Sequence, residues 1–112
     1  MEIRLTIDTD DRRLAFDLMG NPNQIGSGTT VSIPGICDIK LESLFVRKAA
    51  GAPETLELIL NFALGVAGGV LANWIYSKLK GRRVTLRIEE QEVEINEDKI
   101  KKVISRIIEY KK

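Results

Sequence analysis

The sequence predicts an α+β fold, in which a small mixed or antiparallel β-sheet carries a long glycine-rich hydrophobic helix and a C-terminal amphipathic helix on one face. Three observations favour this class. Apolar and polar residues alternate over residues 2–8 and again over 84–95. Residues 58–76 carry no formal charge, and apolar residues near the C-terminus recur at helical spacing. With 112 residues, 44% of them hydrophobic and 29% charged, the chain is expected to form a single domain over residues 1–112.

The N-terminal part is expected to consist mostly of strands. Residues 2–8 have the period of a half-buried strand. Residues 9–20 fit either a short helix or a second strand, and the strand is favoured because Leu14, Phe16 and Leu18 alternate. The other elements expected in this part are a turn-rich loop and two strands, over residues 21–30, 31–33 and 36–46.

A long helix is predicted after the connector RKAAGAP, residues 47–53. Pro53 suits the first turn of a helix, and Glu54 lies near the positive end of the helix dipole. The helix is predicted to run to about Lys80 and to stop at Gly81. Large apolar side chains occupy one side of this helix along its length, whereas small and amide side chains are concentrated on the opposite side.

A β-hairpin is predicted after this helix. Its strands cover residues 84–89 and 93–95, and Glu90 and Gln91 form the turn between them.

The chain is predicted to close with an amphipathic helix that Asn96 caps. On its exposed face we expect two ion pairs at i,i+4 spacing, Glu97 with Lys101 and Asp98 with Lys102. Its apolar stripe is formed by Ile100, Val103, Ile104, Ile107 and Ile108.

Residues 58–76 are long enough to cross a bilayer, and the cations that follow would mark the cytoplasmic side. Asn61, Asn73 and three glycines weaken such an insertion, because an unpaired amide in hydrocarbon is costly. A span would also separate sheet segments that need one another to bury their apolar faces. A helix buried in a soluble domain is therefore favoured. A small membrane-associated protein anchored by residues 58–76 is the alternative, together with a helix that switches between the two states.

The composition argues against an enzyme. The chain has no histidine and a single cysteine, Cys37, which excludes a Ser-His-Asp or Cys-His arrangement and makes a zinc site improbable. Residues 26–29, GSGT, lack the spacing and the lysine of a nucleotide-binding loop. We therefore expect no catalytic residue, no cofactor and no metal. The lone cysteine and the alternating N-terminus, which does not resemble a secretory signal, favour the cytoplasm.

Two stretches carry a family resemblance: DIKLESLFVRKAAGAPETLELILNFALG, residues 38–65, and ANWIYSKLKGRRVTLRIEEQEVEINEDKIKKVISRIIE, residues 72–109. Their order of hydrophobic helix, Trp, basic cluster, hairpin and closing helix resembles the effector-associated constant component family of bacterial conflict systems, which act in antiviral defence. The resemblance implies a non-enzymatic adaptor that couples an effector to its trigger. The implied partners are an effector such as a peptidase, or a signalling NTPase.

The candidate contact surface is the small-residue side of the predicted helix, with the basic residues that follow it. Gly65 and Gly69 form a small-xxx-small pair, which favours close packing against the final helix or against a partner. A homo-oligomer stays open. Nucleic-acid binding is disfavoured, because solvated charges at a helix end explain the basic cluster. The candidate contact residues are Asn61, Gly65, Gly68, Gly69, Asn73, Trp74, Arg82 and Arg83.

Overall fold

The computed structural model describes residues 1–11, 13–19, 28–45, 54–63 and 68–111. Among these residues, six strands form one sheet in the order β2-β3-β4-β1-β5-β6, and every pair of neighbours is antiparallel. The elements are β1 (Glu2–Thr9), α1 (Leu14–Leu18), β2 (Thr30–Ile33), β3 (Cys37–Phe45), β4 (Glu54–Asn61), α2 (Gly68–Leu79), β5 (Val84–Ile88), β6 (Gln91–Val93) and α3 (Glu97–Lys111). The predicted α+β class is confirmed.

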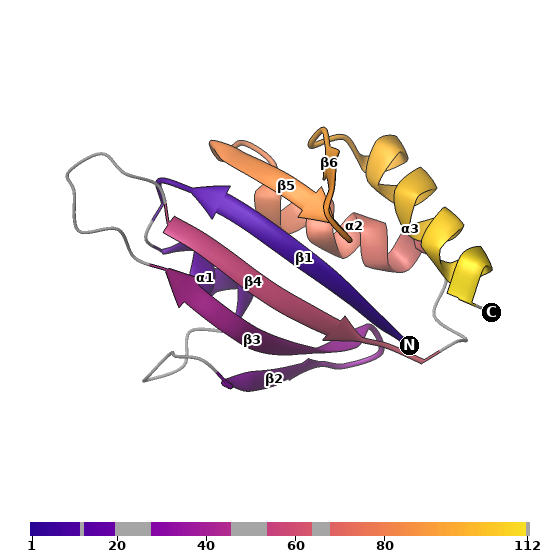
Figure 1. Ribbon diagram of the computed structural model, residues 1–112, viewed down its shortest axis with the longest axis horizontal. Helices are drawn as coiled ribbons and strands as arrows, with labels where there is room; N and C mark the ends of the chain where they lie inside the picture. Colours follow the sequence, from indigo (N-terminus) through magenta and orange to yellow (C-terminus); the bar gives the residue numbers. More distant parts are fainter. Residues whose placement is uncertain (12, 20–27, 46–53, 64–67, 112) are drawn as a thin grey trace.

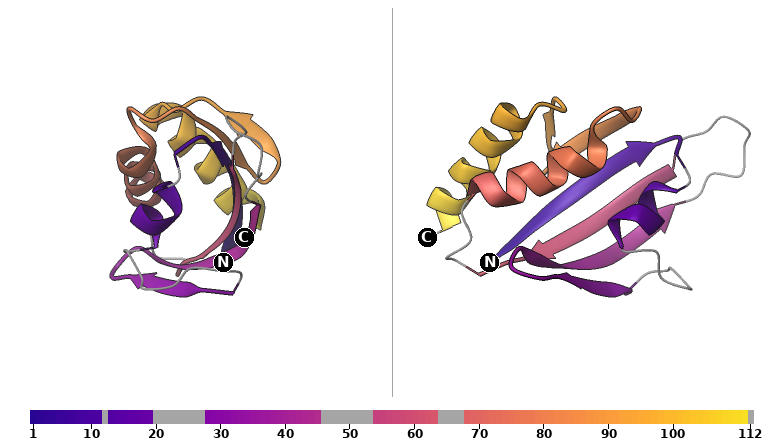
Figure 2. Two further views of the ribbon diagram at one scale, coloured as in Figure 1. Left: turned by 90° about the vertical axis from the view of Figure 1, so that its left-hand side faces the viewer. Right: turned by 180° about the vertical axis from the view of Figure 1, so that it is seen from behind.

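The sheet is curved, and the helices α1 and α2 lie on its concave side, with α3 packed beside α2 (Figures 1 and 2). Strand β1 is central, since it pairs with β4 from Glu2↔Asn61 to Thr9↔Glu54 and with β5 from Leu5↔Ile88 to Thr9↔Val84. Side chains at alternate positions of each strand point into the core, and the next ones face outward. The buried core residues of the central strands are Ile3, Leu5, Ile7, Leu56, Leu58, Leu60, Leu86 and Ile88.

The opposite face of the sheet is polar. Toward the C-terminal end of β1, Asp8 accepts a hydrogen bond from the Thr55 hydroxyl at 2.7 Å and pairs with the Arg87 guanidinium at 3.3 Å. These three side chains come from three adjacent strands, β4, β1 and β5. The sheet thus has a helix-covered apolar side and an outer side that carries polar and charged groups, including the buried Arg87 Nε, which has no hydrogen-bond partner among the described residues.

The prediction of one long helix from Pro53 to Lys80 is wrong. Residues 54–61 form β4, and the helix α2 begins only at Gly68. Leu56, Leu58 and Leu60 are buried at a spacing of two, which is the period of a strand. The outward position between two of them holds the apolar Ile59, so the alternation resembles a continuous apolar run.

The membrane alternative required a continuous helix over residues 58–76. That segment is instead divided between β4 and α2. Within the described ranges no helix combines the length and the apolar character needed to cross a membrane.

The preference for a strand over residues 9–20 is also wrong, because residues 14–18 form the short helix α1. Hydrogen bonds turn the chain before it: Asp11 N donates to Thr9 Oγ1 at 3.0 Å, and Arg13 N donates to Asp11 Oδ1 at 2.9 Å. Leu14 and Leu18 are both buried, since i,i+4 places them on one helical face.

The closing helix is confirmed, with its cap. Asn96 Oδ1 accepts hydrogen bonds from Asp98 N at 3.0 Å and Lys99 N at 3.2 Å. Along the predicted stripe Ile100, Val103 and Ile104 are buried, and Ile107 and Ile108 are half-buried against the core.

Candidate interaction surface

The glycine and amide side of α2 lies against α3, as one of the two predicted packing modes requires. A Cβ at Gly68 would meet Ser105 Oγ at 3.0 Å, and one at Gly69 would meet Lys101 Cε at 3.5 Å. Asn73 Nδ2 donates to Glu97 Oε1 at 3.1 Å. Gly68, Gly69 and Asn73 therefore allow two helices of the same chain to approach closely.

The remaining candidates near α2 do not form one surface. Trp74 is buried in the core. Asn61 is exposed at the end of β4 and lines a shallow pocket of about 390 Å³ beside the turn between β2 and β3. Gly65 lies outside the described residues.

Arg82 connects α2 to α1 and to the turn that precedes α1. Its Nε donates to the carbonyl of Lys78 at 3.0 Å, at the end of α2. Its Nη2 lies 2.6 Å from Asp17 Oδ2, and its Nη1 pairs with Asp11. The hydrogen bond to Asp17 raises the pKa of Arg82. The Arg82 guanidinium thus links the end of α2 to α1, whereas the side chain of the neighbouring Arg83 is exposed.

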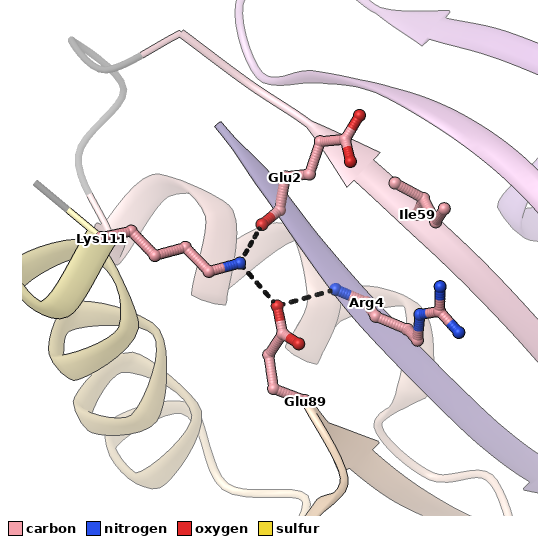
Figure 3. Close-up of a pocket in the computed structure, with 5 residues that line it drawn as sticks. All are labelled: Glu2, Arg4, Ile59, Glu89 and Lys111. Atoms are coloured by element: carbon pink, nitrogen blue, oxygen red, sulfur yellow. Dashed lines mark hydrogen bonds and ion pairs between the residues drawn. The ribbon is translucent and has the colours of Figure 1, made fainter.

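Strand β5 pairs with β1 only from Leu5 onward, which leaves the edge of β1 open at residues 2–4. The side chains of Glu89 and Lys111 bond to this open edge (Figure 3). Glu89 N donates to Arg4 O at 2.9 Å, as in a strand pair, but the reciprocal acceptor for Arg4 N is the side-chain Oε1 of Glu89, at 3.4 Å. Two residues earlier on β1, Glu2 O accepts a hydrogen bond from Lys111 Nζ at 2.7 Å, and the same ammonium donates to Glu89 Oε1 at 2.8 Å. A carboxylate and an ammonium thus take the place of a neighbouring backbone.

A shallow pocket of about 200 Å³ surrounds this contact, lined by Glu2, Arg4, Ile59, Glu89 and Lys111. Of its cations, Lys111 is already bound to the strand and to Glu89, and the pocket holds as many carboxylates as cations. The arrangement fastens the end of α3 to β1.

The turn between β5 and β6 places two glutamates in the left-handed backbone region. Glu89 has φ 50° and Glu90 has φ 71°, and Ile88 faces Gln91 across the turn. The predicted turn at Glu90 and Gln91 is therefore shifted by one residue. This geometry is that of a type I′ turn, for which Asn and Gly are favoured, so side-chain contacts of Glu89 offset part of the backbone strain.

Strand β6 presents a free backbone edge. The backbone amide of Glu89 bonds to β1. Because backbone hydrogen-bonding groups alternate in direction along an antiparallel strand, the N–H and C=O groups of Ile88 and Leu86 point toward β6. The backbone groups of their register partners, Gln91 and Val93, therefore point toward β5. The N–H and C=O of Glu92, which lies between these two residues, point outward from the free edge of β6. In the described part of the chain β6 is the last strand on this side.

A groove of about 320 Å³ runs between this edge and α3, and we call it the β6–α3 groove. Its strand side is formed by Gln91–Val93 and Glu94, and its helix side by Lys99, Lys102, Val103 and Arg106.

The charges of the β6–α3 groove are unevenly paired. Lys99 pairs with Glu94. Lys102 and Arg106 are exposed, and neither takes part in an ion pair within the described residues.

The two i,i+4 pairs predicted for this helix are not formed among the described residues. The carboxylate of Glu97 accepts a hydrogen bond from Asn73 of α2 and does not pair with Lys101. Asp98 lies in the first turn of the helix, which Asn96 caps. The groove was missed because its signal is a basic stripe at i, i+3 and i+7, formed by Lys99, Lys102 and Arg106, and a solvated helix face has the same pattern.

The second free edge of the sheet, β2, is flanked by no comparable group of cations in the described ranges. Ser32 Oγ donates to Asp38 Oδ1 at 2.6 Å there, so the polar side chains nearby satisfy one another.

Cys37 is buried at the start of β3, and burial, followed by the charge of Asp38, raises the pKa of its thiol to about 11. Such a thiol is a poor nucleophile at neutral pH. Within the described ranges, no three His, Cys, Asp or Glu side chains gather in a way that could hold a metal ion.

No protein-family model, curated protein or solved structure matches this chain.

Proposed function

We propose that this chain is a non-enzymatic protein-interaction module of the cytoplasm, an adaptor that couples an effector to its trigger in a bacterial conflict system. The observation that carries the proposal is the β6–α3 groove. It combines an unpaired strand edge at Glu92 with the two cations Lys102 and Arg106, for which the described residues supply no ion-pair partner. A free edge of this kind is a template for a strand from another chain.

The contrast between the open part of β1 and the edge of β6 supports the same proposal. The open part of β1 is closed by Glu89 and Lys111, whereas β6 has no such closure at Glu92 in the described chain. Proteins generally protect free edges against unwanted pairing, so an edge left accessible beside a groove is a reasonable place for a specific partner.

The resemblance to the effector-associated constant component family supplies the class of partner, an effector such as a peptidase or a signalling NTPase. The glycine side of α2 is not needed for this contact, because Gly68 and Gly69 already pack on α3. The proposed contact surface for the partner is therefore the β6–α3 groove and not the glycine side of α2.

Co-expression tests the proposal. The tagged chain is expressed with the products of the genes that adjoin its own, and complexes are separated by size with the mass of each peak measured. We expect the chain to co-elute with a peptidase or NTPase in a fixed ratio. A chain that elutes as a monomer from every such mixture contradicts the adaptor function, and one that elutes only as a homo-oligomer replaces it with self-assembly.

A further inference from the structure

The β6–α3 groove restricts what its partner is made of. An extended segment that pairs with β6 gains main-chain hydrogen bonds at the outward N–H and C=O of Glu92 whatever its sequence. Its side chains then determine specificity, because successive residues of the added strand point to opposite faces of the sheet.

On the helix side, the added strand meets positive charge. Lys102 and Arg106 are exposed in the groove, while the carboxylate of Glu94 is already paired with Lys99. Side chains of the partner that point toward α3 are therefore best matched by carboxylates.

The spacing of the two cations suits a strand. Lys102 and Arg106 are four residues apart on α3, which corresponds to roughly 6 Å along a helix axis. Alternate residues of a strand are separated by roughly 6.6 Å. Residues i and i+2 of an extended partner thus have nearly the same backbone spacing as Lys102 and Arg106 on the helix.

On the other face the charge is opposite. Val93 is buried and Glu92 is exposed, so the alternation of β6 places the Glu92 carboxylate on the outer face of the sheet, away from the core side. Partner residues that point to this outer face are best matched by uncharged or basic side chains. An evenly acidic segment fits less well than an alternating one.

We propose that the β6–α3 groove binds an extended segment of a protein partner in which acidic residues alternate with uncharged ones, the segment adding as a strand to β6 with its carboxylates on Lys102 and Arg106. This inference rests on the proposed adaptor function and specifies the chemistry of its partner.

Fluorescence anisotropy with defined peptides tests it. The probe is a labelled octapeptide of alternating glutamate and threonine, and the comparison peptides are its lysine–threonine counterpart and a version with the four glutamates in one block. We expect saturable, salt-sensitive binding of the alternating acidic peptide, weaker binding of the block peptide and none of the basic one. Failure of the acidic peptide to saturate at about millimolar concentration overturns the proposal.

Two variants locate the site. The double variant K102E/R106E is expected to bind the alternating acidic peptide about tenfold or more weakly, since both ion pairs are lost and replaced by repulsion. The control K80E/R83E changes the net charge equally at two exposed residues outside the groove, and its affinity is expected to stay near that of the unmodified chain. Equal weakening in both variants shows a non-specific charge effect and contradicts the site.

A third variant tests the strand pairing. E92P removes an outward N–H while leaving the register partners Gln91 and Val93 in place, and circular dichroism checks that the sheet is retained. We expect loss of binding. If E92P folds and binds the acidic peptide normally, strand addition is excluded.

A labelled single-stranded oligothymidylate is the last probe. The proposal is overturned, and the cations are assigned to nucleic acid, if this oligonucleotide binds the unmodified chain and not K102E/R106E while the acidic peptide binds neither.

The outcomes separate this inference from the adaptor function. A co-expressed partner that binds the unmodified chain and K102E/R106E equally well contradicts the acidic segment and leaves the adaptor function standing. Absence of any partner contradicts the function itself, whatever the peptides do.

Discussion

The ammonium of Lys111 lies 2.8 Å from Oε1 of Glu89, and these two side chains bond to the carbonyl of Glu2 and the amide of Arg4 at the start of β1 (Figure 3). Residues 2–4 of β1 lie beyond the reach of β5, which pairs with β1 only from Leu5 onward. The contact joins the end of the last helix to the start of the first strand. It also closes one edge and leaves β6 as the accessible one on this side of the described sheet.

Removing either partner of this contact is expected to destabilise the fold modestly. Both side chains are more than a third exposed, at 38% and 36%, so Glu89→Ala and Lys111→Ala should each lower the free energy of unfolding by about 0.5–1 kcal/mol. Hydrogen exchange gives the sharper readout, because the amide of Arg4 bonds to Glu89 and should exchange faster in Glu89→Ala. Unchanged exchange at Arg4 would show that the carboxylate does not act as its acceptor.

The strained turn predicts a stabilising substitution. Glu90 has φ 71°, which glycine adopts without a steric penalty, so Glu90→Gly should raise the free energy of unfolding by about 0.5–1 kcal/mol in urea denaturation. Glu89→Gly relieves similar strain at φ 50° but also loses the contacts to Arg4 and Lys111, and should gain less. An equal gain in the two variants would contradict a stabilising role for the Glu89 side chain.

The two glycines of α2 are expected to respond differently to a methyl group. Gly69→Ala adds an ordinary contact at 3.5 Å to Lys101 and improves helix propensity, so it should stabilise the chain by about 0.5–1 kcal/mol. Gly68→Ala places a Cβ 3.0 Å from Ser105 Oγ, and this crowding should cancel the gain. Thermal unfolding compares the two, and Ser105→Ala should restore the gain in the Gly68→Ala background. Identical effects at the two positions would argue that α3 does not pack there.

Arg82 and Arg83 are expected to differ although they are adjacent. Arg82→Ala removes hydrogen bonds to Lys78, Asp11 and Asp17 that connect α2 with α1, and should cost about 1–2 kcal/mol of unfolding free energy. Arg83→Ala should change it by less than about 0.5 kcal/mol, because its side chain is exposed. Chemical denaturation of both variants is the measurement, and similar losses would refute the bridging role of Arg82.

Cys37 is expected to resist alkylation in the folded chain. The pKa of its thiol is raised to about 11 from 9.0, so at pH 8 almost no thiolate is present. Because the unfolded thiol ionises first, the contribution of Cys37 to stability is intact below about pH 9 and is lost as the pH rises toward 11. Cys37→Ala should remove this part of the alkaline loss. Rapid reaction of the native chain with iodoacetamide at pH 8 would contradict its burial.

Much of the fold follows from local patterns. The strand over residues 2–8, the hairpin after Val84 and the helix capped by Asn96 were predictable, because each has one polar and one apolar side that matches a single period. The strand β4 was not, because Ile59 on its outer face hides the alternation. The helix α1 was not, because Leu14 and Leu18 suit both periods over so short a stretch.

The candidate surface was harder to predict than the fold. Small residues such as Gly68 and Gly69 indicate close approach of another backbone, but they do not say whether it belongs to the same chain. Lys102 and Arg106 became candidates only after the topology placed β6 at an edge beside α3. The charge that stands next to a free strand depends on contacts between elements, which no local pattern records.

Amide chemical-shift mapping of the ¹⁵N-labelled chain with its partner, or with the alternating acidic peptide, tests the central claim most directly. We expect the largest shifts in β6, at Gln91–Val93, and on α3 at Lys102 and Arg106, and we expect the outward amide of Glu92 to gain protection from exchange. Shifts confined to the exposed face around Arg83, or to β2 at the opposite edge, would contradict it.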